Sequence, residues 1–469
     1  MVTRTEHDSL GPVQVPAEAY YGAQTQRAIE NFPVSGIRFP RPFIGALGMI
    51  KHACAEVNVE SGLLDEKLGT AIGEAAREVA EGKWDAEFPL DVFQTGSGTS
   101  TNMNANEVIA NLCNERLGGQ RGSKKPVSPN DHVNKGQSSN DVIPTAAHLS
   151  ALLSLHRHLF GALETLQKSL QKKATEFDGI VKLGRTHLMD AVPVRLGQEF
   201  AGYARQVEKS LRDVRAASET LHELAIGGTA VGTGMNTTPD FGARVAKKLS
   251  EYTKIPVVEA KNHFEAQGGR DDLVWVSGAL KRTACALRKI ANDVRWMGSG
   301  PLGALGELRL PDLQPGSSIM PGKVNPVLSE VLVQVAAQVV GNDVAVAIGG
   351  QSGAFELNVM IPVMVHNVLQ SSEILANGAR LFATKCVDGL EANVERCREL
   401  AEKSLMLVTG LNPYIGYDRA AKVAQEAYQR GISAKQVALE QKLITEEQAR
   451  EIFDLAKMTV PGAKGAGGG

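Results

Sequence analysis

Cysteine is scarce in this chain of 469 residues, and the thiols that are present form no cluster. The five cysteines are Cys54, Cys113, Cys285, Cys386 and Cys397. An odd number of thiols with no C-x-x-C pair is not a disulfide framework, and it lacks the ligand spacing of zinc and iron–sulfur sites. No H-E-x-x-H motif is present either. We therefore expect reduced thiols, no bound metal and no cofactor.

A strong net charge is also missing, because 50 Lys and Arg stand against 52 Asp and Glu and leave a formal charge of −2. Such a balance gives no bulk attraction to nucleic acid or to an anionic membrane, so we expect neither as a partner. The first residues contain no apolar run of the signal-peptide kind, and no stretch of about 20 residues is free of polar interruption. These absences predict a cytoplasmic protein.

Aromatic residues make up only 5% of the chain, so the core must be built from Ala, Leu, Val and Ile, a mix that favours helices packed on helices. Apolar residues recur at helical spacing over 141–178, 196–224 and 272–298. The segment 327–349 is apolar nearly all round its helical axis, as in helices that are buried on every side. Polar residues such as Asn342 make it a poor membrane span, so we expect neighbouring chains to help cover it. The fold is predicted to be predominantly α, with a central bundle of long helices.

Changes in composition divide the chain into three parts. Residues 1–136 are punctuated by Gly and Pro, contain polar loops and include one helical stretch at about 42–82. Residues 137–390 carry the long helices, and residues 391–469 have shorter, more charged ones. We expect an N-terminal domain, a central bundle and a small C-terminal helical domain whose last residues, AKGAGGG, form a flexible tail.

The sequence GSSIMPGKVNP, residues 316–326, stands immediately before the most apolar helix. Its two Gly and two Pro residues exclude a regular helix, so we expect a mobile loop that leads into a helix N-terminus, where anions bind. A nucleotide-binding P-loop does not fit, because five residues separate Gly316 from Gly322 and Val324 stands where Ser or Thr is required. From residue types alone, a capping loop with surface Ser and Lys side chains is an equally good interpretation.

Three other polar clusters stand at the ends of expected helices. They are the Ser-, Thr- and Asn-rich run at 95–106, QSSND at 137–141 and GRTH at 184–187. Each alone is more often a helix cap or a turn. Together with the 316–326 loop, they predict a site that binds carboxylates through hydrogen bonds.

These motifs together resemble the fumarase/aspartase superfamily. The likeness runs over nearly the whole chain and is carried by YYGAQTQR, TGSGTSTNMNANEVIAN, NKGQSSND, GRTHLMDAVPVRLGQEF, GGTAVGTGMNT, FELNVMIPVMVHNV and NPYIGYDRAA, as well as by the 316–326 loop. Within the superfamily the chain is similar to the class II, iron-independent fumarases. Ser138-Ser139 and Tyr417 match that class, whereas aspartases tend to have Ser-Thr and another residue after Ile-Gly.

The resemblance implies a three-domain, predominantly α fold in which the long-helix bundles of four subunits form one core. It implies a lyase that reversibly hydrates a small dicarboxylate, fumarate, to L-malate, in active sites shared between three chains of a homotetramer. Aspartate ammonia-lyase is the nearest alternative, and a succinyl-adduct lyase is more distant. A non-catalytic relative of the lens-crystallin kind is a further alternative, although such a protein need not keep all the expected catalytic residues.

By the same resemblance, the catalytic residues are Ser317, His187, Glu330 and Lys323. Ser317 is the base that removes a proton next to a carboxylate, His187 is the acid for the departing hydroxyl, and Glu330 holds the His187 ring. Lys323 and Asn325 would bind the carboxylate that takes up the extra negative charge. The substrate-binding set is Ser97, Gly98, Thr99, Ser138, Ser139, Asn140, Thr186, Ser318, Lys323, Val324 and Asn325.

One segment departs from the pattern of this class. Fumarases of the class often read His-Pro-Asn-Asp before the NK-QSSND motif and bind a second dicarboxylate there. This chain has Ser128, Pro129, Asn130 and Asp131 at that place, so Ser replaces His, while Lys125 supplies a nearby charge. The replacement weakens the expectation of a second dicarboxylate site at these residues.

Overall fold

The computed structural model describes residues 2–461, and its internal contacts divide the chain into two compact units. Unit 1 comprises Met1–Gly161, Ser210–Ala284 and Val335–Asn377, and unit 2 comprises Ala162–Lys209, Cys285–Gln334 and Gly378–Gly469. The three-domain division expected from composition stays a prediction. The expected AKGAGGG tail lies outside the described residues.

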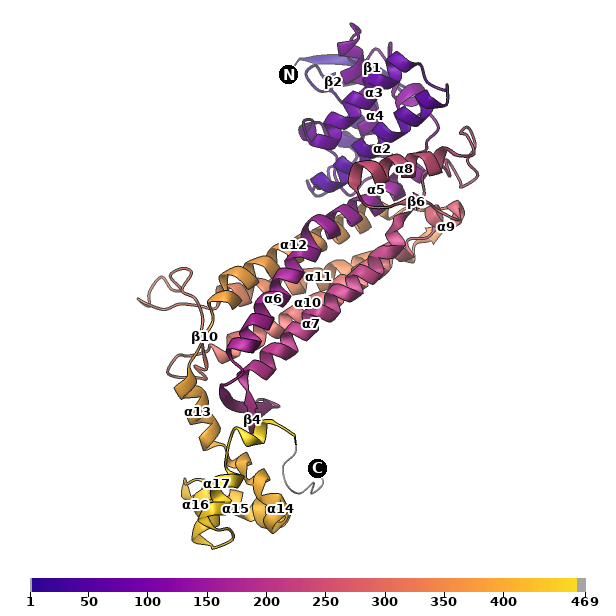
Figure 1. Cartoon of the computed structure of the whole chain (residues 1–469). Helices are drawn as coiled ribbons and strands as arrows, with labels where there is room; N and C mark the ends of the chain where they lie inside the picture. The colour runs from indigo at the N-terminus through magenta and orange to yellow at the C-terminus, as the bar shows by residue number, and fades with distance from the viewer. Residues whose placement is uncertain (1, 462–469) are drawn as a thin grey trace. The chain divides into compact units, whose positions relative to one another are not determined.

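Helices dominate the described residues, which confirms the predicted fold class (Figure 1). The strands are short and pair two at a time. Antiparallel pairs join β1 (Thr3–Asp8) to β2 (Gly11–Pro16), β3 (Val181–Thr186) to β4 (Met189–Arg195), β7 (Leu308–Arg309) to β10 (Glu391–Ala392) and β8 (Gly353–Ala354) to β9 (Leu357–Asn358). With so little sheet, the hydrophobic core is built from helix-to-helix contacts.

Three of the predicted long-helix segments are confirmed. They are α5 (Ser139–Ser154), which continues through a π turn (Leu155–Leu159) into α6 (Phe160–Glu176), then α10 (Asp271–Met297) and α11 (Val327–Gly350). A further long helix, α12 (Ile361–Lys385), comes next in the chain. Their apolar residues recur at the helical period, so each helix buries a stripe or more of its surface.

The helix predicted over 196–224 is shorter than expected. α7 ends at Ser218 after starting at Leu196, and a 3-10 turn and the short strand β5 (Glu223–Leu224) follow it. β5 pairs in parallel with β6 (Val258–Glu259). Leu221 and Leu224 are fully buried, so the core accepts these side chains from a turn and a strand as well as from a helix. The apolar spacing therefore continued past the point where the helix ends.

The N-terminal region is more regular than its composition suggests. The predicted helical stretch at 42–82 is two helices, α2 (Arg41–Glu60) and α3 (Glu66–Glu81). The Asp65 carboxylate caps α3 by accepting the backbone N–H of Leu68 at 3.1 Å, and Gly82, with φ of 90°, ends it. The remaining helices are α1 (Ala23–Asn31), α8 (Phe241–Thr253), α9 (His263–Gly268), α13 (Val394–Lys403), α14 (Asn412–Ile415), α15 (Tyr417–Arg430), α16 (Ala434–Glu440) and α17 (Glu446–Ile452).

Much of the polar run at 95–106 belongs to a buried helix, α4 (Thr99–Arg116). Its asparagines are buried because they hold neighbouring loops through the backbone of those loops. Asn104 donates to the carbonyl of Glu87 at 2.9 Å, Asn111 to that of Tyr20 at 2.8 Å and Asn114 to that of Val127 at 3.0 Å. Each hydrogen bond offsets the cost of burying an amide.

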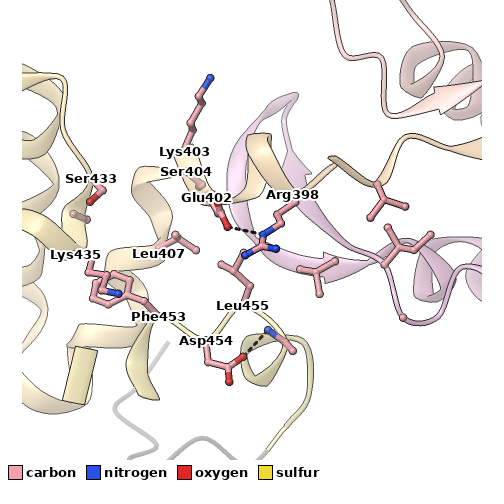
Figure 2. Close-up of a pocket in the computed structure, with 16 residues that line it drawn as sticks. Arg398, Glu402, Lys403, Ser404, Leu407, Ser433, Lys435, Phe453, Asp454 and Leu455 are labelled. Atoms are coloured by element: carbon pink, nitrogen blue, oxygen red, sulfur yellow. Dashed lines mark hydrogen bonds and ion pairs between the residues drawn. The ribbon is translucent and has the colours of Figure 1, made fainter. Parts of the chain in front are cut away.

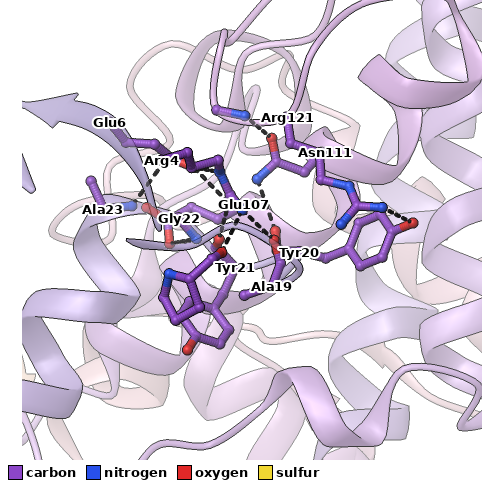
Figure 3. Close-up of polar contacts among 12 residues, drawn as sticks. Arg4, Glu6, Ala19, Tyr20, Tyr21, Gly22, Ala23, Glu107, Asn111 and Arg121 are labelled. Atoms are coloured by element: carbon purple, nitrogen blue, oxygen red, sulfur yellow. Dashed lines mark hydrogen bonds and ion pairs between the residues drawn. The ribbon is translucent and has the colours of Figure 1, made fainter. Parts of the chain in front are cut away.

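The chain before α1 is held by two charged side chains, Arg4 and Glu107 (Figure 3). Arg4 donates to the backbone carbonyls of Pro16, Ala17, Ala19 and Tyr21. The Glu107 carboxylate on α4 accepts the backbone N–H groups of Gly22, Gln24 and Thr25 at the start of α1. Burial raises the pKa of Glu107, and these N–H bonds act in the opposite direction. This N-terminal packing fixes α4, which carries part of the predicted site.

Candidate active site

In unit 1, the N-termini of α4 and α5 bring three hydroxyl groups together. The Ser97 hydroxyl lies 2.8 Å from that of Thr99, and the Thr99 hydroxyl lies 2.8 Å from that of Ser139. Thr99 is the first residue of α4 and Ser139 is the first residue of α5. The positive ends of two helix dipoles and a chain of neutral donors therefore meet, an arrangement that suits a carboxylate.

Gly98 is required at the start of α4 for two reasons. Its φ of +74° lies in the left-handed region, where a residue with a side chain is strained. A Cβ atom at this position would also lie 2.8 Å from the Cγ2 atom of Ile143 on α5. The glycine thus lets the two helix N-termini approach each other.

Ser138 and Asp141 form a capping box at the start of α5. The Ser138 hydroxyl accepts the N–H of Asn140 at 3.2 Å, and the Asp141 carboxylate accepts the N–H of Ser138 at 2.9 Å. Asp141 also accepts the N–H groups of Gly227 and Thr229. Burial raises the pKa of Asp141 to about 6, and its backbone hydrogen bonds limit the rise. The predicted site residue Ser138 is thus a helix cap, which leaves Ser139 as the hydroxyl that meets Thr99.

In unit 2, the 316–326 segment is an irregular loop that leads directly into α11, as predicted. The Ser317 hydroxyl oxygen accepts two backbone N–H groups, from Ile319 at 3.2 Å and from Met320 at 3.0 Å. Donors aimed at this oxygen favour a negative charge on it. No such bond is recorded for the neighbouring, exposed Ser318 within the described part of the chain.

The ends of the loop are tied together by Asn325. Its side-chain amide donates to the carbonyl of Gly316 at 2.7 Å, and the N–H of Gly316 donates to the carbonyl of Lys323 at 2.7 Å. Lys323 and Val324 are exposed. The Lys323 side chain of the loop is thus exposed, while hydrogen bonds of Gly316 join the two ends of the loop.

The predicted acid, His187, lies at the tip of the β3–β4 hairpin in unit 2. Thr186 pairs with Met189, so the loop has two residues, His187 and Leu188, with φ of 56° and 60°. Positive φ at both positions defines a type I′ turn, which normally selects Asn-Gly. A histidine and a leucine in this conformation are strained by about 1–2 kcal/mol each. The strain is maintained by the strands below, and Thr186 and His187 are exposed.

The base of this hairpin is anchored by a buried ion network that our sequence interpretation missed. Glu307 is fully buried, and both its oxygens accept from the Arg185 guanidinium at 2.9 Å. The Lys182 ammonium lies 3.5 Å from Glu307 and 3.0 Å from Glu199. Burial raises the pKa of Glu199. No motif or spacing in the sequence marks Glu307, because its partners lie more than 120 residues away in the chain.

We expect Glu307→Gln to lower the free energy of unfolding by about 3–5 kcal/mol, because it leaves the buried Lys182 and the half-buried Arg185 without enough negative charge. Denaturant unfolding of the purified protein measures this loss. Glu399→Gln is the matched control, since Glu399 pairs with Arg396 and Lys403 on an exposed surface, and its midpoint should stay near that of the unmodified protein. Equal midpoints for the two variants would contradict the anchoring role of Glu307.

The structure therefore groups the predicted residues into three sets. The hydroxyl set of unit 1 comprises Ser97, Gly98, Thr99, Ser138, Ser139 and Asn140. In unit 2 the 316–326 loop carries Ser317, Ser318, Lys323, Val324 and Asn325, and the hairpin tip carries Thr186 and His187. Asn140 donates its side-chain amide to the carbonyl of Ala230 at 2.8 Å. Glu330 lies in the first turn of α11, and within residues 2–461 no hydrogen bond or ion pair joins it to His187.

The segment expected as a second dicarboxylate site bonds mainly to itself. The Ser128 hydroxyl donates to the Asp131 carboxylate at 2.7 Å and accepts the N–H of Asp131 at 3.2 Å. The N–H of Ser128 donates to Nδ1 of His132 at 2.9 Å. Pro129 is buried and Asn130 is exposed. Binding of a ligand at Ser128–Asp131 stays a prediction.

A cavity of about 710 Å³ lies elsewhere in unit 2 (Figure 2). Its lining comes from the start of β3, from α13 and from the C-terminal helices, and includes the apolar Leu407 and Phe453. Arg398 is paired with Glu402, and the Asp454 carboxylate accepts the N–H of Ala456. None of the predicted site residues lines this cavity, so its size does not make it the candidate site.

Among residues 2–461, one helix, α11, is long and apolar enough to cross a membrane by length and composition alone. Its polar residues have partners on neighbouring helices of unit 1. The Asn342 amide donates to Gln370 at 2.9 Å and to Ser371 at 3.0 Å, and the Asp343 carboxylate accepts from Ser277 at 2.8 Å. On other parts of its surface, Val344 and Ile348 are exposed.

Comparisons with known proteins cover almost the whole chain. A family model described as "Lyase" matches residues 11–341, and one described as "Fumarase C C-terminus" matches residues 407–460. The chain is 56% identical to the fumarate hydratase class II of Corynebacterium glutamicum over 461 residues, 97% of this chain and 96% of the relative. It is 53% identical to the mitochondrial fumarate hydratase of Homo sapiens over 450 residues, 96% and 88% of the two chains.

Solved structures agree with these matches. The crystal structure of recombinant class II fumarase from Schistosoma mansoni superposes with a TM-score of 0.95 at 41% identity, and the alignment covers 98% of this chain and 100% of that one.

Proposed function

Because this chain belongs to the class II fumarate hydratase family of lyases, we propose that it catalyses the reversible addition of water to fumarate, giving L-malate. This membership confirms the family resemblance found in the sequence. The observation that carries the proposal is the identity over 97% of the chain. The loop that holds Ser317 between backbone donors supports it from the geometry.

The demanding step in the malate direction is the removal of a proton next to a carboxylate, which places an extra negative charge on an already anionic group. We assign this step to Ser317. A serine hydroxyl is a weak base at neutral pH, and each unit by which its pKa falls needs about 1.4 kcal/mol of stabilisation of the alkoxide. The N–H groups of Ile319 and Met320 support this role because they already point at its oxygen.

Donors around the substrate would hold its two carboxylates. Lys323 and Asn325 bind the carboxylate that takes up the developing charge, where fixed donors lower the barrier most. The remaining contacts would come from neutral groups at the three sets described above. In this proposal they are Ser97, Gly98, Thr99, Ser138, Ser139, Asn140, Thr186, Ser318 and Val324.

His187 donates the proton that the departing hydroxyl of malate needs, and Glu330 holds its ring. The two residues are not bonded to each other within one chain, so we propose that they pair between chains. This pairing requires an assembly. The proposed assembly is a homotetramer in which each active site takes segments from three chains.

We expect the purified protein to sediment as a particle of about 200 kDa, four chains of 50.0 kDa. The exposed apolar residues of α11 support a buried assembly surface, because an apolar face of this kind is costly to leave in water. Val344→Lys should dissociate the particle and abolish activity. Val258→Lys is the matched control, because Val258 is 54% exposed on β6 and Val344 is 56% exposed. An active, monomeric native protein would contradict the shared site.

The activity is tested with enzyme treated with EDTA, using the absorbance of fumarate near 240 nm. We expect malate turnover without added metal and at most a trace of aspartate deamination. Faster deamination of aspartate would assign the chain to the alternative, aspartate ammonia-lyase, and activity restored only by metal would overturn the metal-free proposal. No turnover of either substrate would favour a non-catalytic relative. The cytoplasmic location stays a prediction, since similar relatives include bacterial and mitochondrial enzymes.

A further inference from the structure

Lys51, on α2, is a lysine with no exposed surface. Its ammonium group donates to two neutral oxygens, Oδ1 of Asn134 at 3.0 Å and Oε1 of Gln137 at 2.9 Å. Burying a cation is costly even when its hydrogen bonds are satisfied, and no carboxylate lies within ion-pair distance of Lys51 among the described residues. A neutral side chain of similar size would fill the same space at a lower cost, so packing alone does not account for a lysine here.

The partners of Lys51 connect it to both helix N-termini of the hydroxyl set. Oδ1 of Asn134 also accepts from Asn102 and Asn106, at 3.2 and 3.1 Å, and these two residues lie on the first two turns of α4. The Asn134 amide donates to the carbonyl of Gln137 at 3.1 Å. The next residue in the chain, Ser138, caps α5. Lys51 thus fixes the segment 134–137 between α2 and α4, immediately before α5 begins.

One buried acid, Asp141, opposes the charge of Lys51 at this site. The titratable groups that act on it are Cys54 on its own helix and Asp141 on α5. The side chains that contact it, Asn134 and Gln137, are uncharged amides, and so are Asn102 and Asn106 of α4 behind them. Burial raises the pKa of the Cys54 thiol, which is therefore neutral. The Asp141 carboxylate is bonded to backbone N–H groups of Ser138, Gly227 and Thr229. Burial lowers the pKa of Lys51 to about 8.

We propose that Lys51 is a positioning residue of the dicarboxylate site, whose ammonium group sets the 134–137 segment so that Ser139 meets Thr99 and supplies buried positive charge beneath the two helix N-termini. The inference rests on the proposed function, because it concerns the binding of that substrate. Lys51 does not touch the substrate in this proposal. It acts through Asn134, Gln137 and the start of α5.

The test compares steady-state kinetics of the native enzyme with Lys51→Met and Lys51→Gln. Lys51→Met removes the charge and leaves Gln137 without this donor, while Lys51→Gln keeps a donor without the charge. We expect KM for fumarate and for malate to rise at least about tenfold in Lys51→Met, with kcat changed by less than about threefold, because a binding contact common to ground state and transition state is weakened. Lys51→Gln should show a smaller rise.

Lys173→Met is the matched control. Lys173 is also a buried lysine, bonded to the carbonyl of Leu390 at 2.7 Å and ion-paired with Glu176 at 2.9 Å, and it lies in unit 2, outside the proposed site. We expect this variant to lose thermal stability and to keep the native KM. If Lys51→Met and Lys173→Met change KM equally, the effect comes from removing a buried lysine and not from the position of Lys51.

The pH profile separates charge from packing. As the pH rises through about 8, Lys51 loses its proton, so the native KM should rise between pH 7 and pH 9. Lys51→Gln has no group that titrates at this position. Its KM should therefore be higher than the native KM at pH 7 and should rise less between pH 7 and pH 9. If Lys51→Met does not fold, Lys51→Gln carries the same test.

The outcomes distinguish the inference from the function on which it rests. A native enzyme without fumarate hydration would overturn the proposed function and this inference together. An active native enzyme whose KM and pH profile are unchanged in both Lys51 variants would overturn the positioning role alone.

Discussion

Replacing Ser317 with alanine should lower kcat for malate dehydration by at least about 10³-fold and leave the protein folded. Loss of a positioned general base costs about 10²–10⁴ in rate, and no other side chain in the loop offers an oxygen held by two backbone N–H groups among residues 2–461. The loop should survive the change, because it is closed by bonds of Gly316 and Asn325 that do not involve Ser317. Absorbance of fumarate measures the rate, and thermal unfolding measures the fold.

Ser318→Ala is the matched control for this prediction. The two serines are adjacent, lose the same atom and lie in the same loop, but Ser318 is exposed and lacks the two backbone donors. We expect Ser318→Ala to lower kcat/KM by about tenfold or less, as for the loss of one hydrogen bond to substrate. A larger loss of kcat/KM in Ser318→Ala than in Ser317→Ala would show that Ser317 is not the base.

The long helices could be predicted because their apolar residues follow the helical period, as in α10 and α11. The apolar period did not predict the end of α7 or the start of α4. The end of α7 was placed too late, because Leu221 and Leu224 stay buried after the helix has ended. The start of α4 was described only as a polar cluster, because its asparagines are buried by bonds to distant loops, which leave no periodic pattern.

In the candidate site, the local motifs could be predicted and the long-range contacts could not. Each motif lies within one short segment, so the residue types of the 316–326 loop and of the 137–141 cluster could indicate carboxylate binding. The contacts that support these motifs join distant segments and have no local signature. Lys51 lies 83 residues from Asn134 in the chain, and Glu307 lies 122 residues from Arg185. Likewise, the left-handed conformation of His187 and Leu188 contradicts the usual Asn-Gly preference of the turn, so it could not be predicted.

That conformation makes His187→Asn a sharper test of the proposed acid than an alanine substitution would be. Asparagine adopts positive φ more readily than most residues, so the type I′ turn should persist in the variant. The asparagine side chain is shorter and neutral, so it cannot donate a proton as an imidazolium does. We expect kcat for malate dehydration to fall by about 10²–10⁴, the range for loss of a positioned acid, while the melting temperature stays equal or rises slightly.

Leu188→Gly tests whether activity depends on the backbone conformation of the hairpin tip or on proton donation by His187. Glycine relieves the strain of a φ of 60° at Leu188, worth about 1–2 kcal/mol, and adds about 1 kcal/mol of chain entropy to the unfolded state, so the two effects nearly cancel. This variant should keep kcat within about threefold of the native value, since Leu188 is assigned no contact with substrate. If His187→Asn retains native turnover, His187 is not the acid. If instead Leu188→Gly loses activity to the same extent as His187→Asn, the rate depends on the conformation of the hairpin tip, and the loss in the histidine variant no longer identifies a proton donor.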